Sequence, residues 1–187
     1  LKGQISYVAT NTDAQLAFAR SLGARDYWDN ASPLISKKSN PLFFSQIGVL
    51  PIRFDQGFSI GDNKFLQNDA GDKLIEWFGV KYETTLTLGD TDLEGYYKLA
   101  TVSDDGTIIE AFIGGQWVEI LNNDGQHAPR FQCQNQNSLL HLTRLQNVKI
   151  RVYFYQGPRT QIANVLMFKY VGATENTSAS VAGCELN

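Results

Sequence analysis

The segment from Val148 to Tyr155 alternates between two kinds of side chain, and this alternation predicts a β-strand. One face of the strand is apolar and is expected to belong to the core; it carries Val148, Ile150, Val152 and Phe154. The opposite face is expected to point outward; it carries Lys149, Arg151, Tyr153 and Tyr155. A strand with one apolar face must pack against a second layer, so this segment predicts a layered β protein.

The chain between residues 46 and 172 continues in the same way. Short apolar segments are separated by glycine, asparagine and aspartate, which is typical of a sandwich or a barrel. These segments span residues 74–88, 95–102, 107–113, 116–121 and 162–170. The pair Gly114-Gly115 predicts a two-residue hairpin between two of them. We therefore predict an all-β fold, an antiparallel β-sandwich over residues 46–172.

The two ends of the chain differ from this central part. Residues 1–45 contain a predicted short helix from Asp13 to Leu22, with Asp13 as its cap and Gly23 as its stop, followed by helix-breaking residues. We predict that they form an N-terminal arm or the end of a preceding module. Residues 173–187 are rich in alanine, threonine and serine and predict a tail. The chain begins at Leu1 without a methionine, so we expect a processed product or a piece of a longer protein.

Composition excludes several classes of function. The net charge of −3 and the scatter of the sixteen basic residues argue against nucleic-acid binding. No apolar run approaches the roughly 20 residues that a membrane helix needs. The chain has no nucleophile elbow and no zinc-binding histidine pair, and its two histidines leave little acid–base chemistry near neutral pH. We therefore expect a protein that is not an enzyme.

The only two cysteines, Cys133 and Cys184, are candidates for one disulfide. Such a bond would tether the C-terminal tail and would stabilise the fold by ~4 kcal/mol on the chain-entropy account. The alternative is two reduced thiols.

The dipeptide Asp104-Asp105 is the strongest candidate for a site. It follows an apolar strand pattern and runs into Gly106, so two carboxylates lie side by side on a turn. Calcium prefers six to eight oxygen ligands, carboxylates first, and would relieve the repulsion between them. The alternative is an exposed hairpin turn, because aspartate and glycine are ordinary turn residues.

Four segments of the chain, taken in order, resemble the protective-antigen-type ("PA fourteen") domain, a β-sandwich of toxins, glycosidases, fungal flocculins and bacterial surface adhesins. The resemblance covers residues 46–172. It is carried by Leu74-Ile75-Glu76-Trp77-Phe78, by Gly95 to Gly106 with its Val102-Ser103-Asp104-Asp105 core, by Asn122-Asn123-Asp124-Gly125-Gln126-His127, and by Ile150 to Gly157.

The resemblance implies a calcium site. In lectin-like members a cis peptide joins the paired aspartates, which chelate calcium together with oxygens of a second loop. Carried over, Asp104 and Asp105 supply carboxylates, Gln156 supplies an amide oxygen and Gly157 supplies a carbonyl. Two neighbouring sugar hydroxyls then replace waters on the open side of the ion. Because the site would have only two carboxylates, it is expected to bind calcium weakly, in the micromolar to millimolar range of extracellular calcium modules.

Three further residues near this loop are candidates for contacts with the ligand. Tyr153 and Tyr155 are expected to pack against sugar rings, and Arg159 is expected to meet acidic groups. The partner implied is a cell-surface or matrix glycan, and the location implied is the cell surface or the extracellular space.

One position departs from the family. Some adhesin members place an acidic residue after the Gln-Gly pair, where this chain has Pro158 followed by Arg159. The alternative function is therefore a structural or protein-interaction domain of a larger multidomain or oligomeric surface or fibre protein, with a vestigial metal loop.

Overall fold

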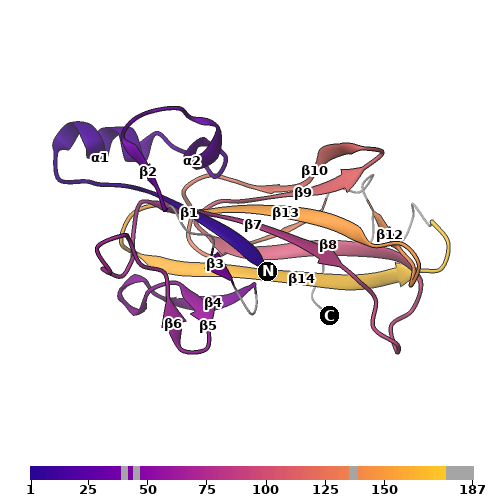
Figure 1. Cartoon of the computed structure of the whole chain (residues 1–187). Coiled ribbons are helices and arrows are strands. Elements are labelled where there is room, and N and C mark those ends of the chain that lie inside the picture. Colours follow the sequence, from indigo (N-terminus) through magenta and orange to yellow (C-terminus); the bar gives the residue numbers. More distant parts are fainter. Residues whose placement is uncertain (39–41, 44–46, 135–138, 176–187) are drawn as a thin grey trace.

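The computed structural model of this chain describes residues 1–38, 42–43, 47–134 and 139–175. Strands predominate, and two short helices lie outside the sheets (Figure 1). The helices are α1 (Asp13–Arg20) and α2 (Asp26–Asp29), with one 3-10 turn η1 (Phe54–Gln56). The strands are β1 (Lys2–Val8), β2 (Ile35–Lys37), β3 (Leu42–Phe43), β4 (Gly48–Arg53), β5 (Ser59–Gly61), β6 (Lys64–Phe65), β7 (Phe78–Leu86), β8 (Gly95–Asp104), β9 (Thr107–Ile113), β10 (Gln116–Asn123), β11 (Arg130–Cys133), β12 (Leu140–Leu142), β13 (Val148–Gln156) and β14 (Gln161–Gly172).

Two antiparallel sheets pack face to face, which confirms the predicted β-sandwich. The larger sheet has the order β10-β9-β13-β7-β1-β2, and β3 also pairs with β1. The smaller sheet has the order β11-β8-β14-β4, and β12 also pairs with β8. The predicted Gly114-Gly115 hairpin joins β9 to β10, and both glycines have positive φ angles that a two-residue turn requires.

The main core lies between the two sheets. The predicted inward face of β13 is confirmed, because Val148, Ile150, Val152 and Phe154 are at most 8% exposed and belong to this cluster. Phe58, from the connection before β5, packs its ring 5.1 Å from the ring of Phe154. Aromatic packing of Phe58 therefore covers part of the inner face of β13.

A second apolar cluster covers the outer face of the larger sheet. Tyr27 of α2 stacks on Tyr155 of β13, with ring centroids 6.1 Å apart. A side chain at Gly79 of β7 would meet Tyr27 at 2.7 Å, so only glycine allows this close approach. The expectation that Tyr153 and Tyr155 face solvent is wrong, because the segment with α1 and α2 covers them and leaves them 4% and 1% exposed.

The N-terminal segment contributes strands as well as a helix. β1 pairs with β7 inside the larger sheet, and β2 and β3 pair with β1. The predicted helix is present as α1, but its cap is Thr12 and not Asp13. The Thr12 hydroxyl accepts from the Gln15 N–H at 3.2 Å, and the Gln15 side chain accepts from the Thr12 N–H at 3.1 Å.

Some predictions fall outside the described residues. Cys184 and most of the expected tail lie there, so the disulfide with Cys133 stays a prediction; Cys133 itself is buried at the end of β11. Residue 46, the expected domain boundary, also lies there. Within the described ranges, no helix combines the length and apolar character needed to cross a membrane.

The packing of Tyr27 on the larger sheet can be tested by mutation. Tyr27→Ala should destabilise the fold by about 3–5 kcal/mol, because it opens a cavity above Gly79 and Tyr155. Tyr27→Phe should remain within about 1 kcal/mol of the wild type, because the hydroxyl has no hydrogen-bond partner. Urea unfolding measures both. A cost below about 1 kcal/mol for Tyr27→Ala would show that the packing of α2 on the larger sheet contributes little to stability.

Candidate functional site

The turn after β8 and the end of β13 meet at one end of the sandwich. The Gly157 N–H donates to Asp105 Oδ2 at 2.7 Å, and the Tyr155 N–H donates to the Gly106 carbonyl at 3.0 Å. The Asp104-Asp105 peptide is cis. The four residues predicted to form one site, although some fifty positions apart in sequence, are therefore brought together.

A third loop, residues 123–127, supports this junction. The His127 N–H donates to Asp105 Oδ1 at 3.0 Å. Asn123 is itself fixed, because it donates to the Ser103 hydroxyl at 2.8 Å and accepts from Arg130 Nε at 2.6 Å. Both ring nitrogens of His127 lie against backbone carbonyls. The loop therefore positions Asp105 through its backbone.

Three buried oxygen atoms at the junction have no hydrogen-bond donor. They are Oδ1 and Oδ2 of Asp104 and Oε1 of Gln156, and both residues are 0% exposed. The amide nitrogen of Gln156 donates to the Gln161 carbonyl at 2.8 Å. Buried polar atoms without partners are unusual in folded proteins and call for an unseen water or ion. Oxygen atoms of this kind are the ligands of a hard cation, so the residues present fit calcium.

The two carboxylates differ in their electrostatic surroundings. Burial, and then the charge of Asp105, raise the pKa of Asp104 from 3.8 to about 7. Burial also raises the pKa of Asp105, but the N–H groups of Gly157 and His127 act in the opposite direction. Asp105 is thus held by backbone donors, while Asp104 has none. A bound cation would supply the missing stabilisation and lower both pKa values.

The Gly157 carbonyl, expected to be a metal ligand, already accepts a hydrogen bond from the Trp77 N–H at 3.3 Å. A carbonyl oxygen has two lone pairs, so this bond leaves it one further acceptor position. In the ranges that the structure describes, no group of three or more His, Cys, Asp and Glu side chains is placed to hold a metal. A cation here would depend on two carboxylates and on neutral oxygens.

The predicted ligand contacts beside the loop have other partners in the structure. Arg159 forms an ion pair with Glu76 at 2.7 Å, and its side chain remains 60% exposed. Tyr153 and Tyr155 lie in the cluster beneath α2, and burial followed by the charge of Asp105 raises the pKa of Tyr155. Neither tyrosine ring is available to stack on a sugar in this arrangement.

Asp124 is a residue of the site that the sequence reasoning did not single out. Its carboxylate accepts from the Ala24 N–H at 3.0 Å and from the Gly125 N–H at 2.9 Å. It lies so close to Gly106 that a side chain there would collide with it. Asp124 therefore ties the N-terminal segment to the junction. The sequence signal was the Asn-Asn-Asp-Gly run, whose distant partner no local pattern could indicate.

Comparisons with known proteins support the fold. No protein-family model matches the chain, and no curated protein matches it in sequence. The fold is similar to that of the Epithelial Adhesin 6 A domain from Candida glabrata, solved in complex with Galβ1-3GlcNAc. That match has a TM-score of 0.52 and 11% identity, and it covers 94% of this chain and 81% of the other.

Two further solved structures are similar. One is an anti-sigma factor domain-containing protein, with a TM-score of 0.51 and 13% identity; the match covers 93% of this chain but only 44% of the other. The other is a PA14 sugar-binding domain from an RTX adhesin, with a TM-score of 0.47, 19% identity and 90% coverage of both chains. The matches with TM-scores of 0.52 and 0.51 support the predicted β-sandwich at the level of the fold.

The isolated chain should lose stability as the pH rises towards neutrality. The pKa of Asp104 is raised to about 7 in the folded state, so this group's contribution is full below pH 3.8 and is lost as the pH rises through 7. The difference between pH 5 and pH 8 should be on the order of 2 kcal/mol in chelator, and Asp104→Asn should remove most of it, leaving the smaller part that comes from Asp105. Urea unfolding of both proteins measures the effect. An equal pH slope in the two proteins would contradict it.

Proposed function

We propose that this chain is a non-catalytic, carbohydrate-binding module whose binding depends on calcium. The observation that carries the proposal is the set of three buried oxygens without donors on Asp104 and Gln156, at the junction of two loops. The likeness of the fold to an adhesin domain solved with Galβ1-3GlcNAc supports the same conclusion.

The residues at the junction of the two loops would offer different oxygen atoms to calcium. Asp104 offers two free carboxylate oxygens, and Gln156 offers its amide oxygen. Asp105 has both oxygens oriented by backbone N–H groups and keeps a second lone pair on each. When bound, calcium supplies a coordination position at which sugar hydroxyls replace water.

The proposed partner is a glycan of a cell surface or extracellular matrix, and the proposed location is outside the cell. The chemistry of the site suits this location, because two carboxylates give the weak affinity that millimolar extracellular calcium can satisfy. The chain would act as one module of a larger surface protein. Neighbouring modules would then add avidity to a weak single site.

Calcium should stabilise the folded chain at neutral pH. We expect saturating calcium to raise the melting temperature by several degrees near pH 7.5, because roughly 3 kcal/mol follows from a concentration one hundred times Kd. Asp104→Asn should abolish the shift. Asp69→Asn, an equal change of charge at an exposed loop position, should leave it intact. Thermal unfolding with calcium and with chelator gives the answer, and the same shift in Asp104→Asn would remove Asp104 from the site.

Sugar binding should require the metal. Calorimetry with Galβ1-3GlcNAc and a panel of simple sugars should show binding in calcium and none in chelator. Asp105→Asn should lose both calcium and sugar binding, because it replaces by a neutral amide the carboxylate that accepts from the Gly157 and His127 N–H groups. Binding that persists unchanged in chelator would remove the metal from the mechanism.

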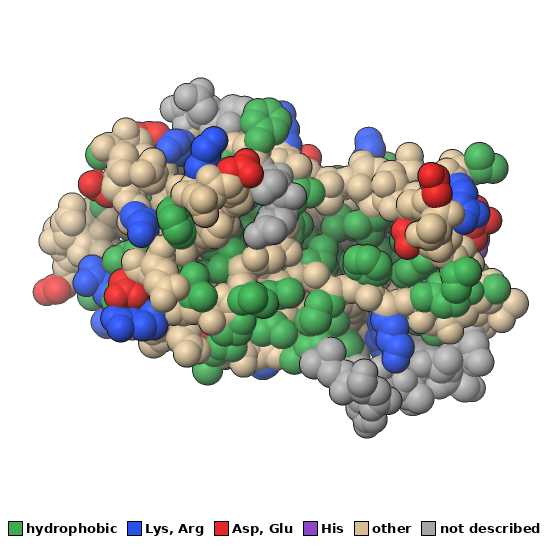
Figure 2. Space-filling view, turned by 90° about the horizontal axis from the view of Figure 1, so that it is seen from below, with side chains coloured by type: hydrophobic (Ala, Val, Ile, Leu, Met, Phe, Trp, Pro, Cys, Tyr) green, Lys and Arg blue, Asp and Glu red, His purple; other side chains and the backbone are tan. Residues whose placement is uncertain are grey.

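A second candidate function is a protein-interaction domain of a surface or fibre protein. Figure 2 shows hydrophobic side chains gathered along the middle of the face seen from below. Exposed apolar side chains on the smaller sheet include Leu50 and Phe168, each 69% exposed. The ion pair between Arg159 and Glu76 also favours this second function, because it engages the basic side chain beside the loop that was expected to meet a ligand. Dimers or trimers in solution without sugar affinity would support this function.

A further inference from the structure

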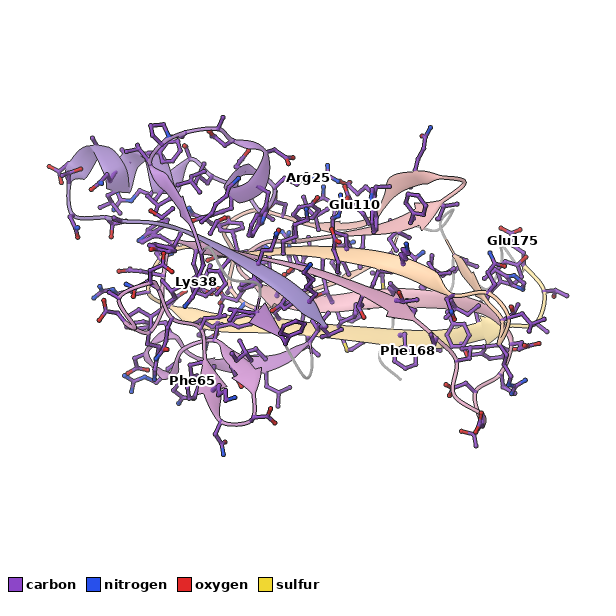
Figure 3. The ribbon with its side chains drawn as sticks, in the orientation of Figure 1. Arg25, Lys38, Phe65, Glu110, Phe168 and Glu175 are labelled. Carbon is purple, nitrogen blue, oxygen red and sulfur yellow. The ribbon has the colours of Figure 1, made fainter. Side chains whose placement is uncertain are left out.

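A groove with three lysines and an exposed aromatic ring lies beside the β5–β6 hairpin. Its volume is about 340 Å³. Figure 3 labels two of its residues, Lys38 and Phe65, on the side of the molecule that carries β5 and β6. The groove is lined by Lys38, Leu42, Ile60, Asn63, Lys64, Phe65, Gln67 and Lys73. It shares no residue with the Asp104-Asp105 junction.

Two of the three ammonium groups are held in place by backbone carbonyls. Lys38 Nζ donates to the carbonyl of Gln67 at 2.9 Å and to that of Asn68 at 3.2 Å. Lys73 Nζ donates to the Gln56 carbonyl at 3.1 Å. An ammonium has three N–H donors, so each keeps at least one for a ligand. Surface lysines are usually mobile, and here the entropy of fixing them has already been lost in the fold.

The stem of Lys73 is fixed as well as its head. It crosses Gly57, whose φ is +82°, and any side chain at Gly57 would collide with the Lys73 methylenes. The ammonium then lies 4.5 Å from the centroid of the Phe65 ring, in cation–π geometry. Phe65 is 37% exposed, so its ring remains available for contact. The groove therefore presents a positive charge over one face of a partly exposed aromatic ring.

The charges of the groove are not neutralised. Among the described residues that line it, none carries a carboxylate. Within the described part of the chain, the ion pairs do not include Lys38, Lys64 or Lys73. This local excess of positive charge stands out in a chain whose net charge is −3. An anion that enters the groove would therefore meet lysine side chains and no carboxylate of the described lining.

We infer that this groove binds an acidic saccharide, that is, a sugar unit with a carboxylate or sulfate group, and that it does so without calcium. The anionic group would accept from the free N–H donors of Lys38, Lys64 and Lys73. The apolar face of the sugar ring would pack on the part of the Phe65 ring that Lys73 leaves exposed. A volume of about 340 Å³ is at the lower end of small-molecule sites and fits one or two sugar rings. An extended acidic peptide would instead need a longer binding surface than this groove provides.

The test is a titration, in chelator, with a sulfated tetrasaccharide of chondroitin sulfate and with chitotetraose as a neutral tetrasaccharide. We expect binding of the sulfated probe only. Lys38→Gln and Lys73→Gln should each weaken it at least about tenfold, because each removes a charge-assisted hydrogen bond. Lys64→Gln is a third variant, and it should leave the fold intact because the Lys64 side chain is exposed. NMR shift changes measure affinity and place the contact.

Control variants separate a built site from general charge attraction. Lys149→Gln removes an equal charge from an exposed position of β13 and should change the affinity less than twofold. Asp104→Asn should leave the affinity unchanged, which separates this site from the proposed calcium site. Three results would overturn the inference: no binding of the sulfated probe, an equal loss in Lys149→Gln, or equally tight binding of a hexaglutamate peptide.

Discussion

Strand β13 is the constraint on which the rest of the molecule depends. Its backbone pairs with β7 on one side and with β9 on the other. Its side chains are buried on both faces, Phe154 in the core between the sheets and Tyr155 beneath the helical segment. A strand held in four directions has no freedom to slip, because a shift of one residue would exchange its two faces. Gln156, the last residue of β13, is therefore held in one fixed position.

The turn after β8 arrives at that position with two adjacent carboxylates. Hydrogen bonds from two loops stabilise Asp105, whereas Asp104 is buried without a donor. An arrangement that leaves a buried carboxylate unpaired destabilises the isolated fold, and such local conflicts are typical of functional sites. The N-terminal segment takes part through Asp124, which joins it to the Asp105-Gly106 turn.

Parts of this arrangement followed from local pattern alone. The alternation from Val148 to Phe154 predicted the inner face of β13, and Gly114-Gly115 predicted the hairpin between β9 and β10, because both signals depend only on neighbouring residues. Helix α1 was also predicted, although its cap is Thr12. The pairing of β1 with β7 was not predicted, because the local sequence of a short strand gives no indication of a partner far along the chain. For the same reason the outer face of β13 was wrongly expected to be exposed.

The candidate site divides in the same way. By itself, the sequence determined which oxygen-bearing residues are present and that Asp104 and Asp105 end an apolar strand, because composition and periodicity are local properties. Its resemblance to a known family supplied the expectation that Gln156 and Gly157 join them. Only the tertiary structure decided that Asp105 is satisfied by backbone N–H groups while Asp104 is left without a donor. It also decided that Arg159 pairs with Glu76 and that lysines from separate segments line one groove. Burial and hydrogen-bond partners depend on which distant segments the sheets bring together, and no local pattern carries that information.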